Sequence, residues 1–170
     1  DEAVLVVQPS EDDTLAIAKR MAAEDERVKV FEYDLVPDWI DTPGFYEKDT
    51  EQPGHLVHMS NWALSKCSYA WICKVEGDVI ALSSVENIVE RILDDVRATH
   101  YFGRVILNVA GVDRSQVSAT NPRNGGWDEC VFPNSPEYKF IRKPRYEVLT
   151  NPHESECMGW SALHMKRCKA

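Results

Sequence analysis

The sequence predicts an α/β domain in which a central, mostly parallel sheet is flanked by helices. Apolar strand-like runs alternate with segments of helical periodicity along the first 100 residues, as in successive β-α-β units. The chain has 170 residues and is 44% hydrophobic, which is enough for one compact domain with a single core but crowded for two. We therefore expect one domain over residues 1–170.

The first three elements are the clearest. The run from Ala3 to Val7 is apolar and β-branched, which is typical of a strand buried on both faces of a parallel sheet. Ser10, followed three residues later by Asp13, predicts a capping box that opens a helix. Residues 27–33 alternate polar and apolar side chains, as in a strand nearer a sheet edge. The inward face of the helix is expected to carry Leu15, Ile17, Ala18, Met21 and Ala22.

The middle of the chain predicts a loop, a helix and a strand. Residues 35–54 carry prolines and glycines among acidic and aromatic residues and predict a long loop. Residues 70–75 form an apolar strand that runs directly into Glu76-Gly77-Asp78. Open α/β sheets bind their ligands at this carboxyl end of the strands. Between the loop and the strand, residues 55–69 regain helical spacing, with an expected buried face of Leu56, Met59, Trp62, Ala63 and Cys67.

Later elements are shorter. Ser83 and Glu86 predict the capping box of another helix, and residues 103–110 predict another strand. Residues 111–127 are polar and rich in turn formers, which favours a mobile active-site loop. The remaining apolar pieces lie at residues 131–132, 138–140, 146–149 and 160–166.

Composition excludes several classes of function. The net charge of −9 and a pI near 5.0 argue against a nucleic-acid-binding surface, which needs clustered Lys and Arg. No apolar run reaches the roughly 18 residues of a transmembrane helix, and the first residues lack a signal pattern. The cysteines are odd in number and form no CxxC pair, so we expect a reducing, cytoplasmic compartment and no zinc. They are Cys67, Cys73, Cys130, Cys157 and Cys168.

The acidic turn after residue 75 is the sharpest local signal. A glycine between two acids lets the backbone turn tightly and lets a ligand approach closely. Carboxylate oxygens are hard ligands that suit Mg²⁺ or Mn²⁺, and Asp78 is the candidate metal ligand. An ordinary acidic turn is the alternative interpretation, because short motifs carry little information by themselves.

Four segments, in the same order, resemble the family-2-like, inverting glycosyltransferases of the GT-A fold. Residues 6–18 resemble that family's strand, acidic serine-rich turn and helix. Residues 60–66 resemble its helix that begins with an alanine-arginine-asparagine motif. Residues 69–78 are similar to the strand and its DxD metal motif. Residues 132–140, followed by Tyr146-Glu147, resemble the acceptor-side segment.

The chain departs from this family at specific positions. Glu76 replaces the first Asp of the metal motif, Ser60 replaces the arginine, and Tyr146 replaces the histidine of a His-Glu pair. Losing the arginine removes a bidentate phosphate partner, for which Lys66 and Arg123 are the possible substitutes. The family's first strand, which precedes the one at Ala3, is missing, so we expect a fragment or a reduced version.

The resemblance implies a function. It implies a glycosyltransferase, of hexosyl- or deoxyhexosyltransferase type, that moves a sugar from a nucleoside-diphosphate sugar to a hydroxyl of a glycan or glycoprotein acceptor. Mn²⁺ or Mg²⁺ would stabilise the charge on the leaving diphosphate. Residues 1–100 would form the nucleotide-sugar-binding half and residues 101–170 the acceptor-side half. Donor-binding candidates are Gln8, Pro9, Asp12, Asp34, Asn61, Lys66 and Glu76.

The catalytic and metal candidates complete this hypothesis. Asp128 is the preferred general base, with Glu129 and Glu147 as alternatives, although a solvated turn also explains the first two. His164 would complete the metal site as a late histidine does in GT-A relatives, or else be a half-buried structural histidine. We interpret His55 and His58 as structural. The competing function is a non-catalytic sugar- or nucleotide-binding module. A nucleotidyltransferase is disfavoured because residues 8–14 form no glycine-rich basic loop.

Overall fold

The computed structural model describes residues 1–75, 79–81, 99–109, 115–119, 130–144, 146–150 and 155–166. The chain divides into two compact units, each made of two separate stretches of sequence. The expected nucleotide-sugar-binding half at residues 1–100 and acceptor-side half at residues 101–170 stay predictions. Unit 1 comprises Asp1–Ala70 and Asn134–Thr150, and unit 2 comprises Trp71–Pro133 and Asn151–Ala170.

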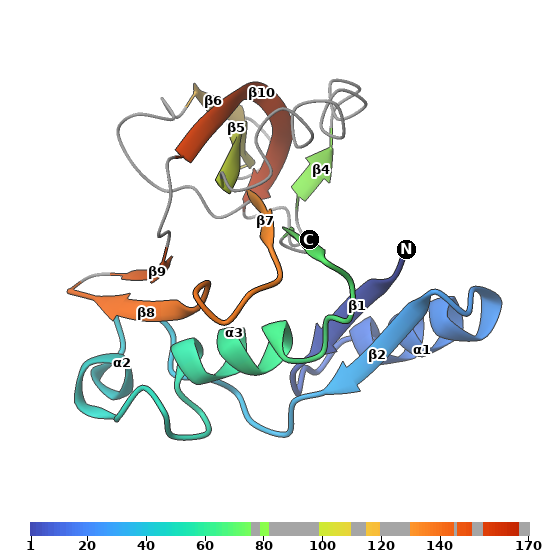
Figure 1. Ribbon diagram of the computed structural model, residues 1–170, viewed down its shortest axis with the longest axis vertical. Helices are drawn as coiled ribbons and strands as arrows, with labels where there is room; N and C mark the ends of the chain where they lie inside the picture. Colours follow the sequence, from blue (N-terminus) through green and yellow to red (C-terminus); the bar gives the residue numbers. More distant parts are fainter. Residues whose placement is uncertain are drawn as a thin grey trace. The chain divides into compact units, whose positions relative to one another are not determined.

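Unit 1 opens with the β-α-β arrangement that the sequence predicts (Figure 1). Strands β1 (Ala3–Val7) and β2 (Val28–Glu32) pair in parallel, with Ala3 opposite Val28 and Val7 opposite Glu32. Helix α1 (Thr14–Glu24) connects the two strands and packs against both. The prediction of a β-α-β unit is confirmed.

Burial around this sheet is shallower than expected. In β1, Val7 is buried, whereas Ala3 is exposed and the three residues between them are half-buried. In α1, Ala18 is the buried residue, and the side chains of Ile17 and Met21 each remain 45% exposed. The prediction that both of these side chains face inward is therefore wrong. A sheet of two described strands offers a helix too little surface to cover a full apolar face.

The start of α1 also differs from the predicted capping box. Asp13 is the N-cap residue, but its side chain makes no capping hydrogen bond. Instead, Oδ1 of Asp12 accepts hydrogen bonds from Ser10 Oγ at 2.7 Å and from the backbone N–H of Thr14 at 3.1 Å. A short carboxylate bonded to the backbone two residues on is an Asx turn. This turn orders the residues that lead from β1 into α1.

The rest of unit 1 consists of two helices and a hairpin. The predicted loop contains one short helix, α2 (Pro43–Glu47), whose first residue is a proline that suits this position. The predicted helix is present as α3 (Leu56–Leu64). Strands β8 (Phe140–Lys143) and β9 (Tyr146–Leu149) form an antiparallel hairpin, and α3 packs against β8.

The core of unit 1 lies where these elements meet. Phe45 of α2 and His55, the residue before α3, are both 0% exposed, and their rings stack with centroids 5.2 Å apart. Other buried side chains come from α3 and from the hairpin region. They are Leu56, Val57, Tyr138, Phe140 and Leu149.

Unit 2 contains one mixed sheet of six strands. The strand order is β3-β7-β5-β10-β4, and β6 pairs with β5. Strands β5 and β10 are parallel, and every other pairing is antiparallel. The bounds are β3 (Trp71–Lys74), β4 (Val79–Ala81), β5 (Thr99–Val109), β6 (Ser115–Ala119), β7 (Cys130–Pro133) and β10 (Ser155–Lys166).

This sheet differs from the mostly parallel sheet expected, and the GT-A fold itself stays a prediction. Residues 103–109 of the strand predicted at residues 103–110 belong to β5, and β6 occupies part of the predicted loop at residues 111–127. The helix predicted to begin at Ser83 and Glu86 falls outside the described residues. Within the described ranges, no helix is long and apolar enough to cross a membrane.

Candidate functional site

The carboxyl edge of the β1–β2 sheet brings several predicted donor-binding residues together in unit 1. Because the two strands are parallel, both end at the same edge, where ligands of such sheets bind. Gln8 directly follows β1, and Asp34 lies two residues beyond β2. The turn after Gln8 contains Pro9 and Asp12. Pro9, Asp12 and Asp34 are exposed, and Gln8 is half-buried.

Gln8 carries an unusual acceptor at this edge. Its Oε1 atom is buried, and no described group donates a hydrogen bond to it. Leaving a buried amide oxygen unpaired costs about 1–3 kcal/mol. The predicted contact of Gln8 with a donor stays a prediction.

Asn61 holds α3 onto the β8–β9 hairpin. Its Nδ2 donates to the backbone oxygen of Phe140 at 2.9 Å, and its Oδ1 accepts from the backbone N–H of Phe140 at 2.7 Å. Both ends of the amide are thus engaged by one backbone residue. This geometry gives Asn61 a structural role, and its predicted contact with a donor stays a prediction.

The neighbouring residue of α3 makes a second link to the hairpin. Ser60 is buried and donates from Oγ to Oε1 of Glu147 in β9 at 3.2 Å. Glu147, one of the candidate general bases, is therefore held against α3. The other two candidates, Asp128 and Glu129, lie outside the described residues.

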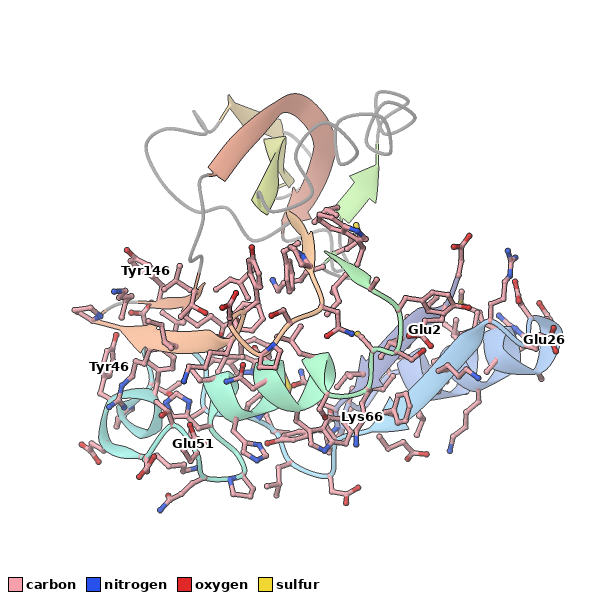
Figure 2. The ribbon with its side chains drawn as sticks, viewed as in Figure 1. Glu2, Glu26, Tyr46, Glu51, Lys66 and Tyr146 are labelled. Carbon is pink, nitrogen blue, oxygen red and sulfur yellow. The ribbon has the colours of Figure 1, made fainter. Side chains whose placement is uncertain are left out.

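Lys66 lies just beyond α3 against two aromatic rings, and Figure 2 labels it. Its Nζ is 4.4 Å from the ring centroid of Trp62 and 5.6 Å from that of Phe31. Such cation–π contacts hold an ammonium group without neutralising it. No described carboxylate lies within ion-pair distance of this group. Lys66 thus keeps its charge available to an anion.

Sequence reasoning missed the contact between Tyr33 and His58. Tyr33 follows β2 and is 6% exposed, and its Oη lies 2.9 Å from Nδ1 of His58 in α3. The same Oη accepts a hydrogen bond from the backbone N–H of Gly54 at 3.0 Å. The only signal in the sequence was the spacing of His58, Trp62 and Lys66, which recur every fourth residue.

His55 has a structural role. Its Nδ1 accepts from the backbone N–H of Val57 at 3.0 Å, so it caps the start of α3. Its Nε2, which therefore carries the hydrogen, donates to the backbone oxygen of Phe45 at 3.1 Å. Arg142 Nη1 donates to the same oxygen at 3.0 Å, and further to the backbone oxygens of Tyr46 and Lys48. These contacts fix α2 in unit 1.

The predicted metal ligands belong to unit 2. Glu76 and Asp78 lie outside the described residues. His164 lies in β10, which runs antiparallel to β4 and places His164 opposite Val79. Val79 directly follows Asp78 in the sequence. The backbone register therefore pairs His164 with Val79, whose neighbour in the sequence, Asp78, is the other predicted metal ligand.

Comparison with known proteins does not assign the chain to a family. No family model matches the chain, and no curated protein matches it. The functional argument therefore depends on the residues and on the geometry described above.

Replacing Asn61 with alanine tests the link between α3 and the hairpin. The change removes the two hydrogen bonds between the Asn61 amide and the backbone of Phe140, so we expect the free energy of unfolding to fall by about 1–3 kcal/mol. Urea denaturation followed by circular dichroism measures this. Asn134→Ala is the matched control, because the exposed Asn134 amide also bonds backbone oxygens and should matter less. Equal losses in the two variants would contradict the assignment.

Glu2 provides a pH-dependent contribution to stability. Its carboxylate accepts hydrogen bonds from the backbone N–H and Oγ of Ser68, which hold the pKa of Glu2 below its ordinary value of 4.5. The charged form is favoured in the folded chain, so this stabilisation is present above pH 4.5 and is lost as the pH falls through the lowered pKa. Glu2→Gln should therefore be less stable than the wild type at pH 7. The difference should shrink in acid, and a constant difference would exclude this linkage.

Proposed function

We propose that the chain is a metal-dependent glycosyltransferase that moves a sugar from a nucleoside-diphosphate sugar to a hydroxyl of a glycan or glycoprotein acceptor. The resemblance of residues 6–18, 60–66, 69–78 and 132–140, in the same order as in the family, carries this proposal. The family resemblance assigns Asp78 and His164 to one metal site.

The pair of ligand types favours Mn²⁺ over Mg²⁺. Mg²⁺ is bound almost entirely by oxygen, whereas Mn²⁺ also accepts imidazole nitrogen alongside carboxylate. When bound, the cation supplies positive charge that stabilises the leaving diphosphate. Asp78 and His164 would hold it, and Glu76 would contribute directly or through water.

Nucleotide binding is assigned to the carboxyl edge of β1 and β2. Gln8, which directly follows β1, is assigned to the nucleobase, since a side-chain amide can both donate and accept hydrogen bonds. Exposed carboxylates at Asp12 and Asp34 suit ribose hydroxyls, which donate hydrogen bonds. We assign Lys66 to a phosphate group of the sugar nucleotide, where the family has its arginine.

Asp128 remains our proposed general base. The base must reach the acceptor hydroxyl by a hydrogen bond in order to take its proton. Glu147 is less suited, because its Oε1 already accepts from the hydroxyl of Ser60. Glu129 is the nearest alternative in the sequence.

A non-catalytic sugar- or nucleotide-binding module is the second candidate. Ser60 stands where the family has its arginine, and its hydroxyl is used for a bond to Glu147 within unit 1. A position that would bind phosphate in a transferase thus serves the fold here. Metal-dependent release of nucleoside diphosphate from sugar nucleotides distinguishes the two functions.

Removing the metal ligands should abolish metal-dependent binding. For Asp78→Ala we expect Mn²⁺-dependent affinity for the sugar nucleotide to fall by more than about 100-fold, and for His164→Ala by about 10- to 100-fold. Isothermal titration calorimetry measures both. Glu24→Ala, a change at an exposed acid of α1, is the control and should bind normally. Unchanged affinity in Asp78→Ala would refute the metal assignment.

The general base is tested separately from binding. Asp128→Asn should keep near-normal donor affinity, while the rate of transfer falls by about 10²- to 10⁴-fold, because the amide cannot take the acceptor proton. Initial rates with saturating donor measure this. Transfer at the wild-type rate would assign the base to Glu129 or Glu147.

A further inference from the structure

The contact between Tyr33 and His58 defines where the hydrogen lies on the histidine ring. The backbone N–H of Gly54 can only donate, so Oη of Tyr33 accepts from it at 3.0 Å. A phenol carries one hydrogen, and Nδ1 of His58 lies 2.9 Å from the same Oη. The Tyr33 hydrogen therefore goes to Nδ1. In the neutral ring, Nε2 then carries the hydrogen of His58.

The opposite arrangement is disfavoured. If Nδ1 of His58 carried a hydrogen, it would donate to Oη, which would then accept twice. The hydrogen of Tyr33 would lose its acceptor, although this tyrosine is only 6% exposed. In the neutral ring, Tyr33 thus favours the tautomer with its N–H at Nε2.

The side of α3 that carries His58 faces the end of β2. The rings of Tyr33 and His58 lie with centroids 6.0 Å apart, and Trp62, one turn further along, lies 5.3 Å from Tyr33. Lys66 lies four residues after Trp62, with its Nζ over the Trp62 ring. His58, Trp62 and Lys66 thus form a row along one side of the chain. His58 is half-buried, and no described residue accepts a hydrogen bond from its Nε2. The row therefore presents a neutral N–H donor at one end and a cation at the other.

We propose that His58 determines specificity in donor binding, and that its Nε2–H binds a neutral oxygen of the nucleoside or sugar rather than a phosphate. This inference rests on the proposed function and assigns one contact within it. A carbonyl or hydroxyl oxygen is a suitable acceptor for the N–H of a neutral imidazole. Lys66 is the group in this row that suits a phosphate.

Nuclear magnetic resonance of the full chain, labelled with ¹³C and ¹⁵N in histidine, tests which ring nitrogen of His58 carries the hydrogen. We expect the ring signals of His58 to show the neutral form with hydrogen at Nε2 at pH 7.5. Tyr33→Phe removes the hydrogen-bond donor and should reduce this preference. His55 is an internal reference, because its own partners fix the same tautomer without Tyr33. A His58 ring with hydrogen at Nδ1, or a charged ring, would overturn the inference.

Binding experiments test whether Nε2–H of His58 contacts a neutral oxygen of the donor. The separate probes are uridine, cytidine, adenosine, guanosine, glucose and inorganic phosphate. At least one nucleoside or glucose should shift the Nε2 signal of His58, and phosphate should not. His58→Phe should weaken binding of that probe by about tenfold, as expected for one lost hydrogen bond. His58→Gln keeps a side-chain N–H and should recover part of the affinity. A shift caused by phosphate, or no shift with any probe, would overturn the inference.

The inference and the proposed function fail in different ways. If a nucleoside binds through His58 but no sugar nucleotide is turned over with Mn²⁺, the transferase proposal fails and the contact stands as part of a binding module. If turnover occurs and His58→Phe binds donor as tightly as the wild type, the inference fails and the transferase proposal stands.

Discussion

The pairing of β4 with β10 fixes the backbone position of His164, one of the two proposed metal ligands. In an antiparallel ladder, each residue has one partner, and a slip by one position would turn every side chain to the other face of the sheet. The register that sets His164 opposite Val79 is therefore specific. In unit 1, strand pairing likewise determines which residues lie at one edge. Strands β1 and β2 are parallel and end at the same edge of their sheet, and Gln8 and Asp34 follow them there.

Helix α3 combines a structural face with a face suited to binding. Ser60 and Asn61 bond to the β8–β9 hairpin, whereas His58, Trp62 and Lys66 line the side that faces the end of β2. The hydroxyl of Ser60 bonds Glu147 within the unit, and the ammonium group of Lys66 lies over the ring of Trp62 on the other face.

Local patterns in the sequence predicted the local structure, and long-range contacts account for the rest. The apolar run at Ala3 and the helical spacing after Asp13 were sufficient for the β-α-β unit. The same spacing could not show that Ile17 and Met21 stay exposed, because burial depends on how much sheet a helix covers. Nor could it decide between Asp12 and Asp13 at the start of α1. The contact of Tyr33 with His58 and the mixed pairing of β5 and β10 join segments that periodicity treats separately.

The metal assignment is the central claim, and paramagnetic broadening by Mn²⁺ tests it most directly. Substoichiometric Mn²⁺ added to the histidine-labelled chain should broaden the ring signals of His164 first, while those of the structural His55 stay sharp. The same addition to Asp78→Ala should leave His164 sharp. Broadening of His164 that persists without the Asp78 carboxylate, or broadening centred on another histidine, would contradict the account.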